Sequence, residues 1–222
     1  MKKWCVSNLL VVALSFQSCF QIVEDVEIFE NGSGKMELKL NMSESRNKLN
    51  TVMTMDSING YKIPSKVEIN NKLKEVGNII GKIHGISNVN TNMDYNNFIM
   101  TLKFNFADVN QINKAMDVIM QQYKIHNASK PTYTYNKATK RFTRTYMTVA
   151  TTLKEFNKLK AEDKKIFDKA SYTAVYRFSN PVNSSSNNLS QLSPNKKAVK
   201  QDAKLLDILN NKTSINQILI HN

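Results

Sequence analysis

Cysteine is almost absent from this sequence of 222 residues, which contains only Cys5 and Cys19. Residues 20–222 can therefore form no disulfide bond among themselves, and their fold must be stabilised by core burial. Histidine is also scarce, and no two histidines have the close spacing of a metal-ligand pair: the three are His84, His126 and His221. We expect no zinc site, because too few ligands of the required type are present. The histidines are expected at the surface or at helix ends.

Catalytic motifs are missing as well. The sequence contains no G-x-S-x-G nucleophile motif, no H-E-x-x-H zinc motif and no P-loop. The Gly-Ser-Gly at 32–34 leads into an alternating strand pattern rather than a helix, so it predicts a tight turn and not a phosphate-binding loop. We therefore expect a protein that is not an enzyme and that needs no cofactor.

Long apolar runs are lacking too. The most apolar stretch, from Leu9 to Phe16, is interrupted by Ser15 and is too short to span a membrane, which requires about 20 apolar residues. It follows the basic pair Lys2-Lys3, and no further charged residue occurs between Lys3 and Glu24. This order of a basic segment and a short apolar segment predicts a secretory signal peptide at 1–18.

The residues that end this segment, Phe16-Gln17-Ser18-Cys19, resemble a loose form of the lipobox of bacterial lipoproteins. In that family a small residue precedes a cysteine that is acylated and becomes the mature N-terminus. The resemblance covers only residues 1–19. It implies lipidation at Cys19 and a body at 19–222 held in the cell envelope, at the outer rather than the inner membrane. Simple secretion and an uncleaved N-terminal anchor remain as alternatives.

Charge is unevenly distributed along the chain. The whole sequence has a formal net charge of +13. Residues 19–42 carry five acidic and two basic side chains, whereas residues 122–177 carry thirteen basic and four acidic ones. A basic surface attracts anionic partners. In the envelope these would be anionic lipids or glycans, beside possible envelope-protein partners, and export argues against nucleic acid.

The hydrophobic pattern of the first half predicts strands and helices in alternation. Period-two alternation predicts strands, and a 3.6-residue period with capping signals predicts helices. The expected strands are 23–30, 36–42, 86–93 and 98–106. The expected helices follow Ser43, Ser65 and Asp108, with capping boxes at Ser65/Glu68 and Asp108/Gln111. This order predicts an α+β fold, in which antiparallel hairpins form a sheet and amphipathic helices pack on one face.

The second half continues the same pattern after a break near 127–131, which could divide the body into two subdomains. We expect strands at 132–135, 141–147, 172–178 and 215–220, and one bent helix or two short ones from Thr152 to Phe167. Residues 180–195 are rich in Asn and Ser and are expected to form an exposed loop.

The hairpin at 132–147 combines aromatic and basic side chains. Tyr133 and Tyr135 share one strand face, Arg144 and Tyr146 share a face of the next strand, and Arg141 lies at the turn. Such a set could bind an anionic lipid or glycan by stacking and charge pairing. The aromatic residues could equally form the core face of an ordinary hairpin, because aromatic residues are common in strands.

Two functions therefore remain. The first is a lipid-anchored, non-catalytic structural or assembly module of the cell envelope. The second is a lipoprotein that binds an anionic lipid or glycan through its basic second half. An apolar cavity rimmed by basic residues would favour the second.

Overall fold

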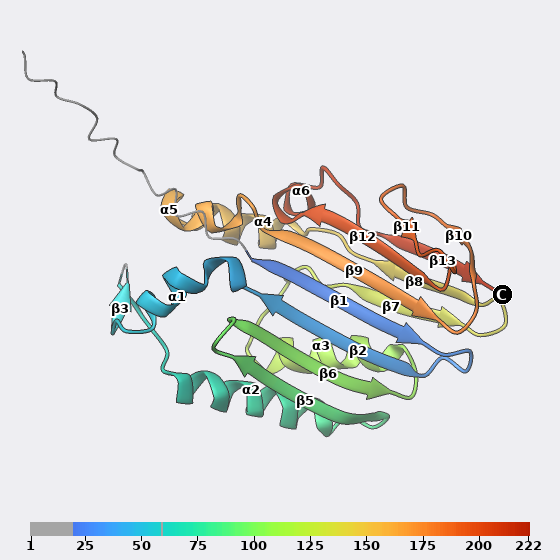
Figure 1. The fold of residues 1–222 in the computed structure, drawn as a ribbon, viewed down its shortest axis with the longest axis horizontal. Coiled ribbons are helices and arrows are strands. Elements are labelled where there is room, and N and C mark those ends of the chain that lie inside the picture. The colour runs from blue at the N-terminus through green and yellow to red at the C-terminus, as the bar shows by residue number, and fades with distance from the viewer. Residues whose placement is uncertain (1–19, 59) are drawn as a thin grey trace, which may run out of the picture.

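The computed structural model describes residues 20–58 and 60–222. Two larger β-sheets, a two-stranded hairpin and several helices make up this part of the chain (Figure 1). The expected α+β class is confirmed, with hairpins and packed helices in the predicted order. Cys19 and the predicted signal peptide lie outside the described residues. No helix in the described part is long and apolar enough to cross a membrane.

Seven strands form the large sheet, in the spatial order β11, β12, β9, β1, β2, β6 and β5. In that order they cover Gln191–Leu192, Ala198–Lys204, Ser171–Phe178, Gln21–Ile28, Gly34–Asn41, Ile99–Phe106 and Ile86–Asp94. Neighbouring strands are antiparallel, except that β1 and β9 run parallel with Gln21 opposite Ser171. Antiparallel hairpins therefore dominate the sheet, as expected, and the parallel pair of β1 and β9 is an addition that the sequence did not indicate. Periodicity does not reveal a parallel partner that is reached through a long connection.

Four strands form a second, small sheet, in the order β10, β13, β8 and β7. They cover Val182–Ser185, Gln217–His221, Arg141–Thr145 and Thr132–Asn136. The predicted hairpin of β7 and β8 is confirmed, with Tyr133 opposite Arg144. Phe142 of β8 packs against the large sheet, where its ring centroid lies 5.0 Å from that of Tyr176 and 6.0 Å from that of Phe178. A separate short hairpin consists of β3 (Ser57–Ile58) and β4 (Tyr61–Lys62).

Two of the helices, α2 (Lys66–Gly81) and α3 (Asn110–Gln122), and the small sheet cover one face of the large sheet (Figure 1). The other α-helices are α1 (Arg46–Val52), α4 (Ala150–Lys158), α5 (Ala161–Lys164) and α6 (Leu205–Leu209), and the 3₁₀ turns are η1 (Ser43–Ser45) and η2 (Lys165–Phe167). Helix α2 contacts β5, and α3 contacts both α2 and β7. Ile80 of α2 and Ile112 of α3 are fully buried in the same core as Phe142.

The two predicted capping boxes have different outcomes. Ser65 caps α2, since its hydroxyl accepts from the Glu68 amide while the Glu68 carboxylate accepts from the Ser65 amide. The box at Asp108 is wrong, because the N-cap of α3 is Val109 without a side-chain cap. The Asp108 carboxylate instead accepts from the backbone and side chain of Asn110, a local turn that competes with capping.

The segment 180–195 also differs from the prediction of a plain loop. It contains β10 and β11, which pair with β13 and β12. Most of its polar side chains are exposed, as the composition suggested, but Val182 is buried. Strand β12 was not predicted, because charged residues interrupt its short apolar pattern. Residues on both sides of 127–131 contribute to the large sheet and to one hydrophobic core.

Candidate functional site

Glu24 is a carboxylate buried between the two sheets. It lies on β1, where Glu24, Val26 and Ile28 alternate on the inward face while Asp25 and Glu27 face outward. Only 3% of Glu24 is exposed. An ionised side chain is almost never buried in this way unless it is paired, so its partners define the site.

Arg144 is the partner of opposite charge. It lies on β8 of the small sheet, is 2% exposed, and places its Nη2 3.5 Å from Glu24 Oε2. Its Nη1 donates to the carbonyl oxygen of Ile215 at 3.2 Å. The guanidinium carbon also lies 5.2 Å from the ring centroid of Tyr172 and 5.6 Å from that of Tyr146. Charge pairing and cation–π contact therefore both hold this arginine in the interior.

Tyrosines complete the set. The Tyr172 hydroxyl donates to Glu24 Oε2 at 2.7 Å, and the Tyr176 hydroxyl donates to Glu24 Oε1 at 3.1 Å. Burial raises the pKa of both tyrosines well above the ordinary value, and the Glu24 charge raises it further. Burial acts to lower the pKa of Arg144, but Glu24 and the tyrosines outweigh it, so that pKa is raised. The tyrosines thus stay protonated and the arginine stays charged.

Some buried polar atoms beside this set make no hydrogen bond within the described residues. They are the Tyr133 hydroxyl, Arg144 Nε, and both side-chain polar atoms of Gln201, which is fully buried on β12. Burial also raises the pKa of Tyr133 well above its ordinary value. We call Glu24, Tyr133, Arg144, Tyr172, Tyr176 and Gln201 the intersheet cluster. Its members are at most 6% exposed, so it cannot receive a substrate without an opening of the two sheets.

The structure divides the predicted ligand-binding residues. Tyr133 and Arg144 belong to the intersheet cluster, and Tyr146 lies beside it, half-buried. Tyr135 is half-buried and its hydroxyl lies 2.9 Å from Nε2 of His221. Arg141 is exposed at the start of β8 and does not join the others.

Two expectations about histidine and metal sites bear on this region. The surface placement predicted for His221 is wrong, because it is 3% exposed and its ring stacks on Tyr135. The reason is that the final strand of the chain turns it inward between the two sheets. Within residues 20–58 and 60–222, no group of three or more potential metal ligands occurs.

Four members of the cluster were not expected from the sequence: Glu24, Tyr172, Tyr176 and Gln201. Glu24 is one of four acidic residues between positions 24 and 30, so its residue type alone does not distinguish it. Its phase was the available signal, since Glu24 precedes the buried Val26 by two residues and Ile28 by four. Gln201 has the same relation to the buried Val199, but its strand was not predicted.

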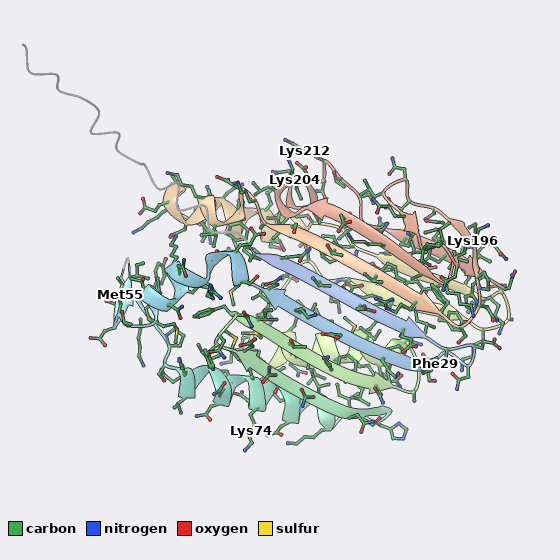
Figure 2. The ribbon with its side chains drawn as sticks, in the orientation of Figure 1. Phe29, Met55, Lys74, Lys196, Lys204 and Lys212 are labelled. Carbon is green, nitrogen blue, oxygen red and sulfur yellow. The ribbon has the colours of Figure 1, made fainter. Side chains whose placement is uncertain are left out.

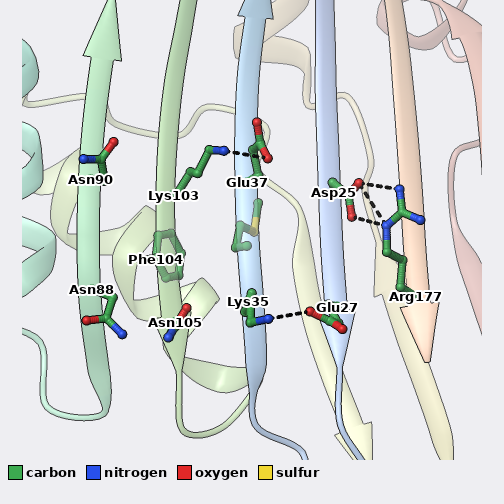
Figure 3. A pocket seen from close by; sticks show the side chains of 11 residues that line it. Asp25, Glu27, Lys35, Glu37, Asn88, Asn90, Lys103, Phe104, Asn105 and Arg177 are labelled. Atoms are coloured by element: carbon green, nitrogen blue, oxygen red, sulfur yellow. Dashed lines mark hydrogen bonds and ion pairs between the residues drawn. The ribbon is translucent and has the colours of Figure 1, made fainter. Parts of the chain in front are cut away.

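The outer face of the large sheet carries a second polar set (Figure 3). Arg177 donates to both carboxylate oxygens of Asp25, at 2.8 to 3.1 Å, across the parallel pair of strands. Glu37 pairs with Lys39 and Lys103, each at 3.2 Å. Burial acts to raise the pKa of Glu37, but these lysines lower it overall. An open hollow of about 440 Å³ lies on this face of the sheet. The acidic and basic side chains that line it neutralise one another.

An apolar groove of about 610 Å³ runs along the N-terminal half of α2. Its lining includes Ile69, Leu73 and Val76, which are half-buried, together with Met100 of β6. The rim carries two ion pairs, Lys62 with Glu68 at 2.7 Å and Lys72 with Glu75 at 2.8 Å. The groove therefore belongs to the first half of the chain and has a mixed rim, not the basic second-half rim that was considered.

The chain has little detectable similarity to known proteins. No protein-family profile and no curated protein sequence matches it significantly. Among solved structures, it is similar to the NMR structure of the folded domain of LppM from Mycobacterium tuberculosis, with 9% identity and a TM-score of 0.44. The alignment covers 93% of this chain and 91% of that one. A similarity this weak assigns neither a family nor a function.

Proposed function

We propose that the chain is a lipid-anchored lipoprotein of the cell envelope whose body acts as a non-catalytic structural or assembly module. The intersheet cluster carries the second half of this proposal. Its carboxylate, guanidinium and phenol groups bond to one another between the sheets at no more than 6% exposure. The groups with the most unusual environments thus join two sheets instead of facing a substrate.

The lipobox resemblance at 16–19 carries the first half. Strand β1 begins at Gln21, so only Phe20 separates it from the predicted acylated residue. An anchor at Cys19 would hold the folded body directly at the membrane surface. Several acyl chains make such attachment stable, since a single chain gives only marginal binding.

The experiment compares Cys19→Ala with the matched control Cys5→Ala, which replaces the other cysteine inside the predicted signal peptide. Cells are labelled with a fatty-acid analogue and then fractionated. We expect label and membrane association in the wild type and in Cys5→Ala, and neither label nor cleavage at residue 19 in Cys19→Ala. A Cys19→Ala protein that is labelled and processed like the wild type would overturn the anchor.

The groove along α2 favours a second candidate, binding of a lipid by the body. Its volume and apolar lining suit an acyl chain, although its rim is neutral overall. Native mass spectrometry of the purified protein tests this candidate with Leu73→Glu, inside the groove, and Asn78→Glu, exposed on the same helix. Loss of a co-purifying lipid in Leu73→Glu alone supports lipid binding. Absence of any lipid from the wild type contradicts it.

A further inference from the structure

One end of the molecule carries Phe20, which follows the predicted anchor residue in the sequence, and we call it the anchor end. Strands β1 and β9 both start there, and the Ser171 amide donates to the carbonyl oxygen of Phe20 at 3.1 Å. Ser43 and Glu44 of η1 line a small hollow with Phe20. Figure 1 shows α4, α5, α1 and β3 at this same end of the long axis. A chain acylated at Cys19 would therefore present these elements to the membrane.

The segment from α4 to η2 covers the anchor end without burying itself. None of the residues in α4, α5 or η2 is fully buried, and Phe156, Ile166 and Phe167 are only half-buried. Phe167 makes edge-to-face contacts with Phe20 and Phe156, with ring centroids 5.6 and 5.2 Å apart. Leu153 and Leu159 are also only half-buried. This aromatic and aliphatic layer, beside the first described residue, retains apolar surface that water still reaches.

The β3–β4 hairpin, the residues just before it and the first turn of α2 add exposed apolar side chains at the same end. Tyr61 is 61% exposed and Val67 is 67% exposed, and Met55 and Ile58 are exposed as well. Figure 2 places Met55 at this end and Lys196 at the opposite end of the long axis. Large apolar side chains gathered on one exposed surface indicate an interaction site.

Lysines accompany these apolar groups. Residues 150–170 contain six lysines and four acidic residues. Lys160 and Lys165 are exposed, and the Lys164 ammonium lies 5.7 Å from the ring centroid of Phe156. Apolar and aromatic side chains next to lysines are the combination by which helices bind in the interface of anionic bilayers.

We infer that the anchor end docks on the surface of an anionic phospholipid bilayer. The inference rests on the proposed function, because an anchor at Cys19 brings this end to the membrane. The side chains at Phe156, Phe167, Ile58 and Tyr61 would enter the headgroup region, and the lysines would pair with lipid phosphates. The long axis of the molecule would then extend away from the membrane surface. The end that carries Lys196 would face the aqueous phase.

The test must not depend on acylation in cells. The members of the core cluster lie between Val26 and Leu219, so a body starting at Phe20 keeps that core. A hexahistidine tag replaces Cys19, and a nickel-chelating lipid holds the body on vesicles at the position of the anchor. This body contains no cysteine. Single cysteines at Ile58, Lys165 or Lys196 can therefore each carry a fluorophore, with a quencher placed in the bilayer.

On vesicles with phosphatidylglycerol, we expect quenching at Ile58→Cys and Lys165→Cys and none above background at Lys196→Cys. The pair Lys160→Gln and Lys164→Gln should reduce the quenching at Ile58→Cys to its level on phosphatidylcholine vesicles. The matched pair Lys196→Gln and Lys197→Gln should leave it unchanged. Equal quenching at all three positions, or none at any, overturns the docking surface. Because the tag supplies the attachment, that result leaves the acylation of Cys19 to its own labelling experiment.

Discussion

Arg144 of the small sheet and Glu24 of the large sheet form an ion pair in the interior, with Nη2 and Oε2 3.5 Å apart. Both residues are at most 3% exposed. The pair therefore connects the two sheets at a point where neither residue contacts water freely. Removing one member of a buried pair leaves an uncompensated charge, whereas replacing both with apolar groups often costs little.

A double-mutant cycle should show this coupling. We expect Arg144→Met and Glu24→Leu each to lower the free energy of unfolding by about 3–5 kcal/mol, because each leaves one buried charge unpaired. The double variant should lose less free energy of unfolding than the sum of the two single losses. Urea denaturation of the four proteins measures the cycle. Additive losses would contradict the pairing.

Alkaline pH should unfold the protein through its buried tyrosines. The pKa values of Tyr133, Tyr172 and Tyr176 are raised in the folded state, primarily by burial. The unfolded chain therefore loses these protons first, near the ordinary value of about 10. Stability should be independent of these groups below that pH and should fall as pH rises above it. Denaturant midpoints and tyrosinate absorbance between pH 8 and 12 check this, with Tyr172→Phe and Tyr176→Phe expected to reduce the pH dependence.

Glycine substitutions should have opposite effects at two positions. A Cβ on Gly34 would lie 1.9 Å from the Glu27 carbonyl oxygen and 2.6 Å from the Phe106 ring. Gly34→Ala should therefore lower the free energy of unfolding by at least about 1–3 kcal/mol, as expected for overpacking. Gly81→Ala, where the nearest side-chain atom is 3.8 Å away, should stabilise the end of α2 by up to about 0.5–1 kcal/mol. Equal melting temperatures for the two variants would contradict this difference.

The Glu68 carboxyl at the start of α2 should titrate well below the ordinary pKa of glutamate. Lys62 first, and then Ser65, lower the pKa of Glu68 to about 2. The stabilisation from these contacts is present above the unfolded value of 4.5 and is lost as pH falls toward 2. Carboxyl NMR titration should show a larger rise of this pKa in Lys62→Gln than in Ser65→Ala. A wild-type value near 4.5 would be inconsistent with both contacts.

The local pattern was sufficient for the hairpins and for α2. Alternation along 36–42 and 98–106 depends only on which face of a strand is buried, and the spacing of Ser65 and Glu68 depends only on helical geometry. Both signals depend only on residues close in the sequence, so they predict these elements without knowledge of the fold. The bounds of β2, β6 and α2 follow them closely.

The partners of those elements could not be predicted in the same way. Glu24 and Arg144 lie on strands of different sheets, and neither strand pattern indicates that the two residues meet. The β7–β8 hairpin had two open interpretations, and the burial of Tyr133 and Arg144 depends on the large sheet packing over them. The local sequence does not indicate that the two sheets stack on each other. It also does not indicate that β1 and β9 pair in parallel.

The central claim is that Cys19 becomes an acylated N-terminus directly before the folded body. Intact-mass measurement of the protein purified from membranes tests it most directly. We expect a chain that starts at Cys19, with an added mass equal to a diacylglyceryl group and, where the cell supplies it, a further acyl chain. An unmodified chain starting at any other residue would contradict the claim.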